Sequence, residues 1–291
     1  MFTGTYTAIV TPFKNGQLDE AAFRKLVDFQ IENGVNGIVP VGTTGEAATL
    51  DYDENMRVVE LALEQANGRC EIIAGTTSNS THKAVELTKG VAKLGVNAVL
   101  VASPYYNKPT QEGMYRHYRA ISEIGPTKVV LYNIPSRTAS EIKVETCARL
   151  VQDFKNIVSI KEAGGSTERV ALLRNALPKE FTILSGDDAM TVPFMAIGAA
   201  GVVSVASNIV PKQIGELVNA ALKGRFDTAG ELHLKYFPLL QDLFIESNPI
   251  PVKTALFLMG MIENEFRLPL CEIGKANLEK LRTTLAHFKL L

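Results

Sequence analysis

The sequence predicts an α/β fold: a closed (β/α)8 barrel, or TIM barrel, followed by a helical C-terminal module. Short apolar runs alternate with helical patterns at a spacing of roughly thirty residues. Similar segments recur at 33–39, 94–100 and 197–203, each with a glycine where a helix turns into a strand. No GxGxxG motif follows the first strand, which favours a closed barrel over the competing doubly wound open sheet.

Each predicted strand is a continuous apolar run, as expected for parallel strands that are buried on both faces. We expect the eight strands at 7–13, 37–41, 71–76, 98–104, 128–135, 157–163, 181–186 and 201–207. Asp19 and Asp51 have the position of helix N-caps, and Glu54 completes a capping box with Asp51. Gly34 and Gly95 are expected to end helices.

The strand pattern stops near Gly224, where a second region begins. The remainder predicts three helices, at 229–245, 252–265 and 275–288, with prolines in the breaks. We therefore expect a barrel domain at 1–224 that carries the active site and a three-helix module at 225–291. The segment 255–261 is more apolar than one amphipathic face requires, which favours packing on the barrel and a surface for another subunit.

Composition excludes several classes of function. Hydrophobic residues make up 46% of the 291 residues, enough for a full core, and the net charge of −1 gives no field that would attract nucleic acid or an anionic membrane. The three cysteines and four histidines are too scattered for a zinc or redox motif. No signal-peptide pattern or membrane-spanning apolar run is present. We expect a cytoplasmic protein without a metal site, a nucleic-acid partner or a membrane segment.

Lys161 is the first candidate catalytic residue, because it ends the apolar run IVSIKEA at 157–163. In barrels, side chains at the carboxyl ends of the strands perform the chemistry. Burial lowers the pKa of an ammonium group, by up to ~3–5 units at the extreme, and the resulting neutral amine can form an imine with a carbonyl. The alternative is a structural lysine whose stem crosses apolar surface while its charged end reaches water.

Hydroxyl groups follow two other strands. Thr43 and Thr44 lie between glycines in a turn whose backbone N–H groups suit a small carboxylate or phosphate, although the pattern also fits an ordinary βα turn. Tyr105 and Tyr106 follow the fourth strand, where they could pack or transfer a proton.

Two further strand ends carry aromatic and charged groups. Tyr132 lies one strand from Lys161, and Arg137 could bind a carboxylate bidentately or form a surface ion pair. Asp187 and Asp188 resemble metal ligands but lack a histidine partner, so we expect them to cap a helix and support the site. One lysine, several hydroxyls and one arginine favour imine chemistry on a keto acid.

Six segments together resemble the dihydrodipicolinate synthase family of pyruvate-dependent class I aldolases, which includes N-acetylneuraminate lyase. They are GTTGE at 42–46, PYYNKP at 104–109, YNIPSRT at 132–138, IKEA at 160–163, SGDD at 185–188 and NPIPVK at 248–253. The resemblance covers almost the whole chain. It implies condensation of pyruvate with L-aspartate 4-semialdehyde to 4-hydroxytetrahydrodipicolinate, in lysine and diaminopimelate biosynthesis.

The resemblance also implies roles for individual residues. Lys161 would form the imine with pyruvate, so that no other cofactor is needed, and Thr43, Tyr132 and Tyr106 would relay protons. Tyr106 would come from a neighbouring subunit of a homotetramer built as a dimer of dimers. The implied substrate-binding residues are Thr44 for the pyruvate carboxylate, Arg137 for the semialdehyde carboxylate, and Gly186 and Val203 in the pocket lining.

A regulatory cleft at the subunit interface is a further implication of the resemblance. Many relatives are inhibited there by lysine. The matching residues are Ala48, Tyr52, Asn55, Asn79, Lys83 and Tyr105. Inhibited relatives carry glutamate at the position of Lys83, and histidines at those of Tyr52 and Asn55. A cation in place of that acid disfavours binding of an ammonium group, so we expect the cleft to be non-functional.

Three other functions are possible for a barrel with this lysine. A sister aldolase acting on sialic acid or a 2-keto-3-deoxy sugar acid would need a wall that binds a polyol, whereas Arg137 favours a short carboxylated aldehyde. A regulatory barrel that binds a keto acid without turnover would not need Lys161, Tyr132 and Thr43 together. A pyridoxal-phosphate enzyme would need a phosphate-binding cup, which the sequence lacks.

Overall fold

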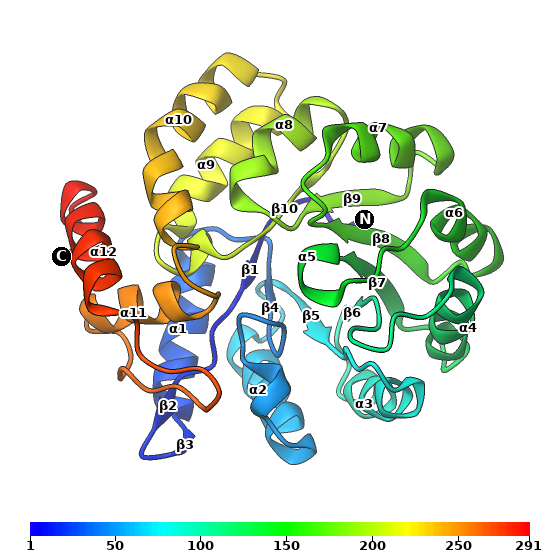
Figure 1. The fold of residues 1–291 in the computed structure, drawn as a ribbon, viewed down its shortest axis with the longest axis horizontal. Coiled ribbons are helices and arrows are strands. Elements are labelled where there is room, and N and C mark those ends of the chain that lie inside the picture. The colour runs from blue at the N-terminus through cyan, green and yellow to red at the C-terminus, as the bar shows by residue number, and fades with distance from the viewer.

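The computed structural model describes residues 1–291, and its central feature is a closed barrel of eight parallel strands in the order β1-β10-β9-β8-β7-β6-β5-β4 (Figure 1). The barrel strands are β1 (Gly4–Ala8), β4 (Gly37–Val39), β5 (Glu71–Gly75), β6 (Ala98–Ala102), β7 (Lys128–Asn133), β8 (Ile157–Glu162), β9 (Thr182–Ser185) and β10 (Gly201–Ser204). The first and last of these strands pair with each other, which closes the barrel. The predicted fold class is confirmed.

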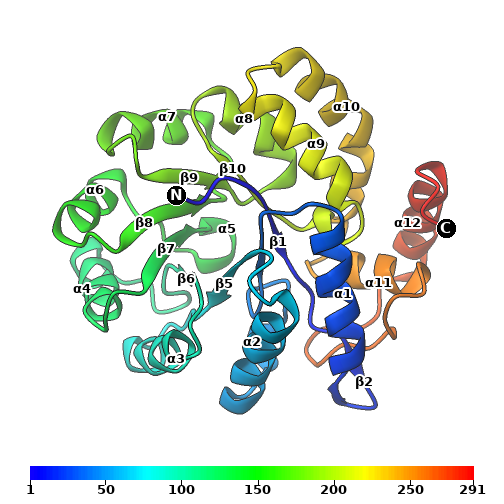
Figure 2. The ribbon, with the colours of Figure 1, turned by 180° about the vertical axis from the view of Figure 1, so that it is seen from behind.

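Helices surround the barrel: most form a ring around it, the short helix Pro135–Thr138 lies over its centre and the last helix lies outside the ring, as Figure 1 and Figure 2 show from opposite sides. They are α1 (Glu20–Glu32), α2 (Tyr52–Ala66), α3 (Thr81–Lys93), α4 (Gln111–Ser122), α5 (Pro135–Thr138), α6 (Val144–Asp153), α7 (Thr167–Ala176), α8 (Thr191–Ala196), α9 (Pro211–Leu222), α10 (Phe226–Asp242), α11 (Ile250–Leu258) and α12 (Lys275–His287). Short 3-10 helices lie at η1 (Ala47–Thr49), η2 (Asp188–Met190) and η3 (Ala206–Asn208). No helix combines the length and apolar character needed to cross a membrane.

The predicted helix starts are confirmed at α1 and α2. Asp19 accepts a hydrogen bond from the backbone of Ala22, and Asp51 and Glu54 form a reciprocal capping box. These side chains satisfy backbone N–H groups that have no partner in the first turn. Gly34 and Gly95 follow the ends of α1 and α3 with φ of +81° and +86°, a conformation that favours glycine.

The predicted first strand, 7–13, is wrong in its bounds, because β1 spans Gly4–Ala8. Beyond Ala8 the chain leaves the barrel wall: the Val10 amide donates to the side chain of Asn208 at 3.2 Å. The Thr11 hydroxyl donates to the carbonyl of Gly45 at 2.7 Å. Phe13 then enters a separate hairpin formed by β2 (Phe13–Lys14) and β3 (Gln17–Leu18).

Several other predicted elements are too long, among them the strands predicted at 37–41, 98–104 and 201–207, which end at Val39, Ala102 and Ser204. The fifth strand ends at Asn133 rather than Pro135, because Pro135 occupies the first turn of α5, where its missing N–H needs no partner. The helix predicted at 252–265 is α11, which ends at Leu258. Gly260 follows it with φ of +73°, a left-handed conformation typical of helix ends.

The C-terminal helices share a hydrophobic cluster with the barrel helices. Gly224 lies in the turn between α9 and α10, and α10 packs on α8, α9 and α12. Leu240, Val252 and Leu281, one from each C-terminal helix, are fully buried in the cluster that surrounds the barrel. Within segment 255–261, Ala255 and Leu256 are buried and the rest is at least partly exposed. The boundary at 224/225 stays a prediction.

Candidate active site

A cavity of about 360 Å³ opens at the carboxyl end of the barrel. It is lined by five of the predicted catalytic and substrate-binding residues: Thr43, Thr44, Tyr132, Arg137 and Lys161. They come from the turn after β4, the end of β7, helix α5 and the end of β8. The barrel therefore brings together residues that are separated by more than a hundred positions in the sequence.

Lys161 lies inside this cavity wall with a relative exposure of 6%. It pairs in register with Tyr132 of the adjacent strand, and its Nζ lies 4.3 Å from the centre of the Tyr132 ring. Burial lowers the pKa of Lys161 to about 8; the carboxylate of Asp188 raises it and the cation of Arg137 lowers it further, both less strongly than burial. An appreciable fraction of this amine is therefore neutral near pH 7, as attack on a carbonyl requires.

Tyr132 is also buried, and burial raises the pKa of its phenol well above the ordinary value. The positive charge of Arg137 and a hydrogen bond with the Thr43 side chain oppose this shift. The phenol consequently stays protonated at neutral pH, able to donate a proton and to accept one through its lone pairs. Tyr132 thus has its hydroxyl hydrogen-bonded to Thr43 and its ring next to the lysine amine.

The turn Gly42–Glu46 presents its backbone to the cavity. It is closed by hydrogen bonds from Gly45 N to Gly42 O at 3.1 Å and from Glu46 N to Thr43 O at 3.2 Å. The N–H groups of Gly42, Thr43 and Thr44 donate to no protein acceptor. Together with the threonine hydroxyls they form a set of donors that suits a small carboxylate.

Asn248 connects two walls of the cavity, a role that the sequence analysis missed. Its Nδ2 donates to the hydroxyl of Thr44 at 3.0 Å, and its carbonyl accepts from Nη2 of Arg137 at 3.2 Å. Its Oδ1 is buried without a hydrogen-bond partner. The NPIPVK segment was a visible signal, but only the fold shows that it reaches residues 111 and 204 positions away.

Gly186 and Val203 are close to the lysine and to Tyr132 respectively, but neither is among the residues that line the cavity. A Cβ added to Gly186 would lie 3.0 Å from Cε of Lys161, so the glycine leaves room for the lysine stem. Val203 is buried in the barrel interior, in the cluster that contains Tyr132. Gly186 therefore borders the lysine stem, and Val203 shares a buried cluster with Tyr132.

The two adjacent aspartates have structural roles, as expected. Asp187 caps η2 by accepting from Ala189 N. Asp188 is buried and accepts from the hydroxyl of Ser204 and from two backbone N–H groups at 2.9 and 3.0 Å. No group of three or more histidine, cysteine or acidic side chains is arranged to hold a metal ion.

The two tyrosines after β6 lie differently. Tyr105 lines the cavity and is 39% exposed, whereas Tyr106 is 88% exposed and does not line it. Tyr106 has φ of +72°, and the next residue, Asn107, donates to the carbonyl of Asn79 at 2.9 Å. Within one chain, Tyr106 is therefore separated from the other members of the expected proton relay.

The remaining residues of the expected regulatory cleft lie on or near α2 and α3. Ala48 lines the main cavity. Asn55 is buried and donates to two backbone carbonyls at 2.7 and 3.1 Å. Tyr52 and Lys83 are both exposed. The hydroxyl of Tyr52 packs against Gly90 of α3, where an added Cβ would lie 2.3 Å from it.

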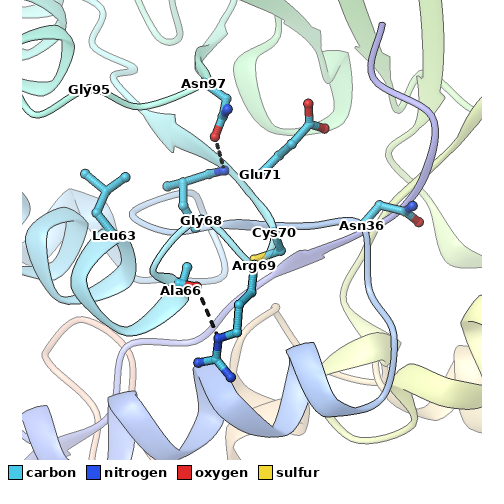
Figure 3. Close-up of a pocket in the computed structure, with 10 residues that line it drawn as sticks. Asn36, Leu63, Ala66, Gly68, Arg69, Cys70, Glu71, Gly95 and Asn97 are labelled. Atoms are coloured by element: carbon cyan, nitrogen blue, oxygen red, sulfur yellow. Dashed lines mark hydrogen bonds between the residues drawn. The ribbon is translucent and has the colours of Figure 1, made fainter.

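A second cavity, of about 510 Å³, lies at the opposite, amino end of the strands (Figure 3). Its polar groups are largely occupied: Asn97 accepts from Ile72 N at 2.7 Å, and Arg69 donates to Asp28 at 2.6 Å. Burial raises the pKa of the Cys70 thiol to about 11, so that thiol is unreactive at neutral pH. Although larger, this cavity lacks a reactive nucleophile and is not the candidate active site.

A closed barrel with a buried, partly neutral lysine and unpaired backbone N–H donors at its mouth has the features of an enzyme that forms imines with keto acids. Comparison with known proteins agrees. The family model of the dihydrodipicolinate synthetase family matches residues 1–288. This chain belongs to that family.

Individual relatives are similar over their whole length. The 4-hydroxy-tetrahydrodipicolinate synthase of Sulfurihydrogenibium sp. is 50% identical, with 100% of both chains covered. The solved synthase from Methylacidiphilum fumariolicum is 54% identical with a TM-score of 0.98, covering 99% of this chain and 96% of that one. The dihydrodipicolinate synthase from Acinetobacter baumannii, solved in complex with pyruvate, is 44% identical with a TM-score of 0.97 over 100% of both chains.

The ionisation of Lys161 can be measured directly. After reductive ¹³C-methylation, the NMR resonance of Lys161 is expected to titrate near pH 8, because burial disfavours the charged form of this amine. Lys161→Ala should remove that resonance and no other. A Lys161 resonance that titrates at the ordinary pKa of a lysine would contradict the proposed desolvation.

Proposed function

We propose that this protein is a lyase that condenses pyruvate with L-aspartate 4-semialdehyde to give 4-hydroxytetrahydrodipicolinate, in lysine and diaminopimelate biosynthesis. The observation that carries the proposal is the buried amine of Lys161, with a pKa of about 8, beside Tyr132 in a cavity with carboxylate-binding donors. Relatives about half identical over the whole chain carry the name of this synthase. These relatives favour synthase activity over the activity of a sister aldolase.

The proposed reaction begins at the ketone of pyruvate. The neutral amine of Lys161 attacks C2, and loss of water gives the imine. Loss of a proton from C3 then gives an enamine, whose C3 attacks the aldehyde carbon of the semialdehyde. The amino group of the semialdehyde finally attacks C2 and displaces Lys161, which closes the ring. The imine itself accepts the electron pair, so we propose that no further cofactor takes part.

The roles of the surrounding residues follow from their positions. We propose that Thr44 and the turn amides bind the pyruvate carboxylate, and that Thr43 and Tyr132 move protons to and from the substrate. Arg137, held by the Asn248 carbonyl at the cavity wall, would bind the semialdehyde carboxylate. Gly186 and Val203 would shape the space around the lysine and Tyr132 from behind the lining.

We further propose that Tyr106 completes the proton relay of a neighbouring subunit in a homotetramer, a dimer of dimers. Its exposure of 88% in a single chain supports this, because a large aromatic side chain so exposed has a surface available for a partner. The proposed place of the enzyme is the cytoplasm.

The imine assignment can be tested by chemical trapping. Borohydride reduction in the presence of pyruvate should leave a stable adduct on Lys161, located by peptide mass mapping, because only this lysine is both buried and open to the cavity. Lys161→Ala should form no adduct and no product from pyruvate and the semialdehyde. Lys155 is an exposed lysine six residues earlier in the sequence, and Lys155→Ala should behave as wild type. An adduct elsewhere, with Lys161→Ala still active, would contradict the mechanism.

The role of Tyr106 can be tested by complementation between subunits. Tyr106→Phe should lower kcat by about 10²–10⁴-fold, the usual contribution of an acid–base group. When Tyr106→Phe and Lys161→Ala subunits are mixed and exchanged, hybrids should regain activity, because one of their sites has both residues intact. If subunit exchange is demonstrated and activity does not return, Tyr106 acts within its own chain or not at all.

The expected regulatory cleft can be tested with L-lysine. Activity should be nearly unchanged at millimolar L-lysine, because the cation of Lys83 would repel the ligand's ammonium groups. Lys83→Glu should increase sensitivity, whereas Lys89→Glu, an exposed lysine on the same helix, should not. Strong inhibition of the wild type at sub-millimolar L-lysine would show that Lys83 does not face the ligand.

A further inference from the structure

A buried ion pair joins the turn Gly42–Glu46 to the C-terminal module. Lys253 Nζ of α11 contacts Oε1 of Glu46, and the two side chains are 1% and 0% exposed. The ammonium group also lies 4.4 Å from the ring centre of Phe13 and 4.9 Å from that of Phe266. Neither charged group has a part in the proposed chemistry.

Glu46 has an unusual place in the chain. It is the last residue of the turn and has φ of +52°, a left-handed conformation that is uncommon outside glycine. Its second carboxylate oxygen accepts from the backbone N–H of Arg267 at 3.3 Å. Both contacts of this carboxylate come from the C-terminal region, so Glu46 anchors the turn to α11 and to the segment after it.

A buried ion pair is a weak source of stability, because removing both charges from water offsets much of their attraction. The effect of this ion pair is to fix the position of the turn Gly42–Glu46 relative to α11. Three and two residues before Glu46, Thr43 and Thr44 line the cavity, and their backbone N–H groups have no protein acceptor. Thr44 is itself held by Asn248, two residues before α11 begins. The same C-terminal segment thus holds the turn at two points.

We propose that the Glu46–Lys253 ion pair positions the donors of the turn Gly42–Thr44 for the substrate carboxylate. The inference rests on the proposed function, in which that carboxylate belongs to pyruvate. Glu46 and Lys253 act as positioning residues, through the turn, and do not touch the substrate. The competing interpretation is that the pair stabilises the fold alone.

A set of variants separates positioning from stability. Glu46→Gln and Lys253→Met each remove one charge, and the double variant removes both. The matched control is Lys280→Met. Lys280 belongs to the C-terminal module, and its Nζ lies 2.7 Å from Oδ1 of Asp242. Neither residue of this pair lines the cavity. For each protein, the initial rate of borohydride trapping is measured against pyruvate concentration, and the thermal midpoint is measured without pyruvate.

The double variant should have a thermal midpoint near that of the wild type, because no unpaired charge is left buried. Its pyruvate concentration at half-maximal trapping should nevertheless rise about tenfold, as expected for loss of roughly one hydrogen bond to the substrate. The trapping rate at saturating pyruvate should change much less, since Lys161 and Tyr132 are untouched. Lys280→Met should alter neither the half-saturating concentration nor the saturating rate.

A folded double variant with the half-saturating pyruvate concentration of the wild type would overturn the inference, and so would an equal rise in Lys280→Met. If the double variant does not fold, Glu46→Gln decides. Its neutral amide can still accept from Lys253, so a rise of a few-fold is expected, and an unchanged value overturns the inference.

Trapping needs pyruvate alone, which separates this inference from the proposed synthase activity. If the variants behave as expected but the wild type forms no product with the semialdehyde, the proposed function is wrong and the positioning role stands. If pyruvate gives no adduct even with the wild type, both are wrong.

Discussion

Burial of one amine at the mouth of the barrel is the constraint on which the rest of this structure depends. Gly186 leaves room for the stem of Lys161, because a Cβ there would lie 3.0 Å from Cε of the lysine. The pKa of Lys161 is lowered because the barrel closes around it, and closure requires β1, near the start of the chain, to pair with β10. Tyr132 on the adjacent strand then lies over the amine at 4.3 Å. The lowered pKa of Lys161 therefore depends on closure of the barrel.

The C-terminal region contributes to the same site rather than forming an appendage. Asn248 joins Thr44 to Arg137, and Lys253 holds the end of the Gly42–Glu46 turn. The cavity therefore has one wall made by barrel strands and another fixed by residues that follow the barrel. A (β/α)8 barrel commonly places its catalytic groups on the βα loops, and here these loops are themselves restrained by the helices that come after them.

Much of this arrangement can be predicted from the sequence, and the exceptions have a common physical cause. The apolar run that ends in Lys161 predicts the strand and the position of its lysine, and local hydrogen-bond chemistry predicts the caps at Asp19 and Asp51. The site role of Asn248 and the partner of Glu46 could not be predicted, because contacts 204 and 207 residues apart leave no periodic pattern. The departure of the chain from β1 after Ala8 likewise depends on distant Asn208.

The separation of Glu46 from Lys253 also has a consequence for the growing polypeptide on the ribosome. At roughly 5–20 residues per second, the 207 residues between them take on the order of 10–40 s to synthesise. Throughout that interval the Glu46 carboxylate has no counter-ion, and burying it alone is strongly unfavourable. The turn Gly42–Glu46 is therefore expected to stay hydrated in the nascent chain and to take its final position only after α11 has been made.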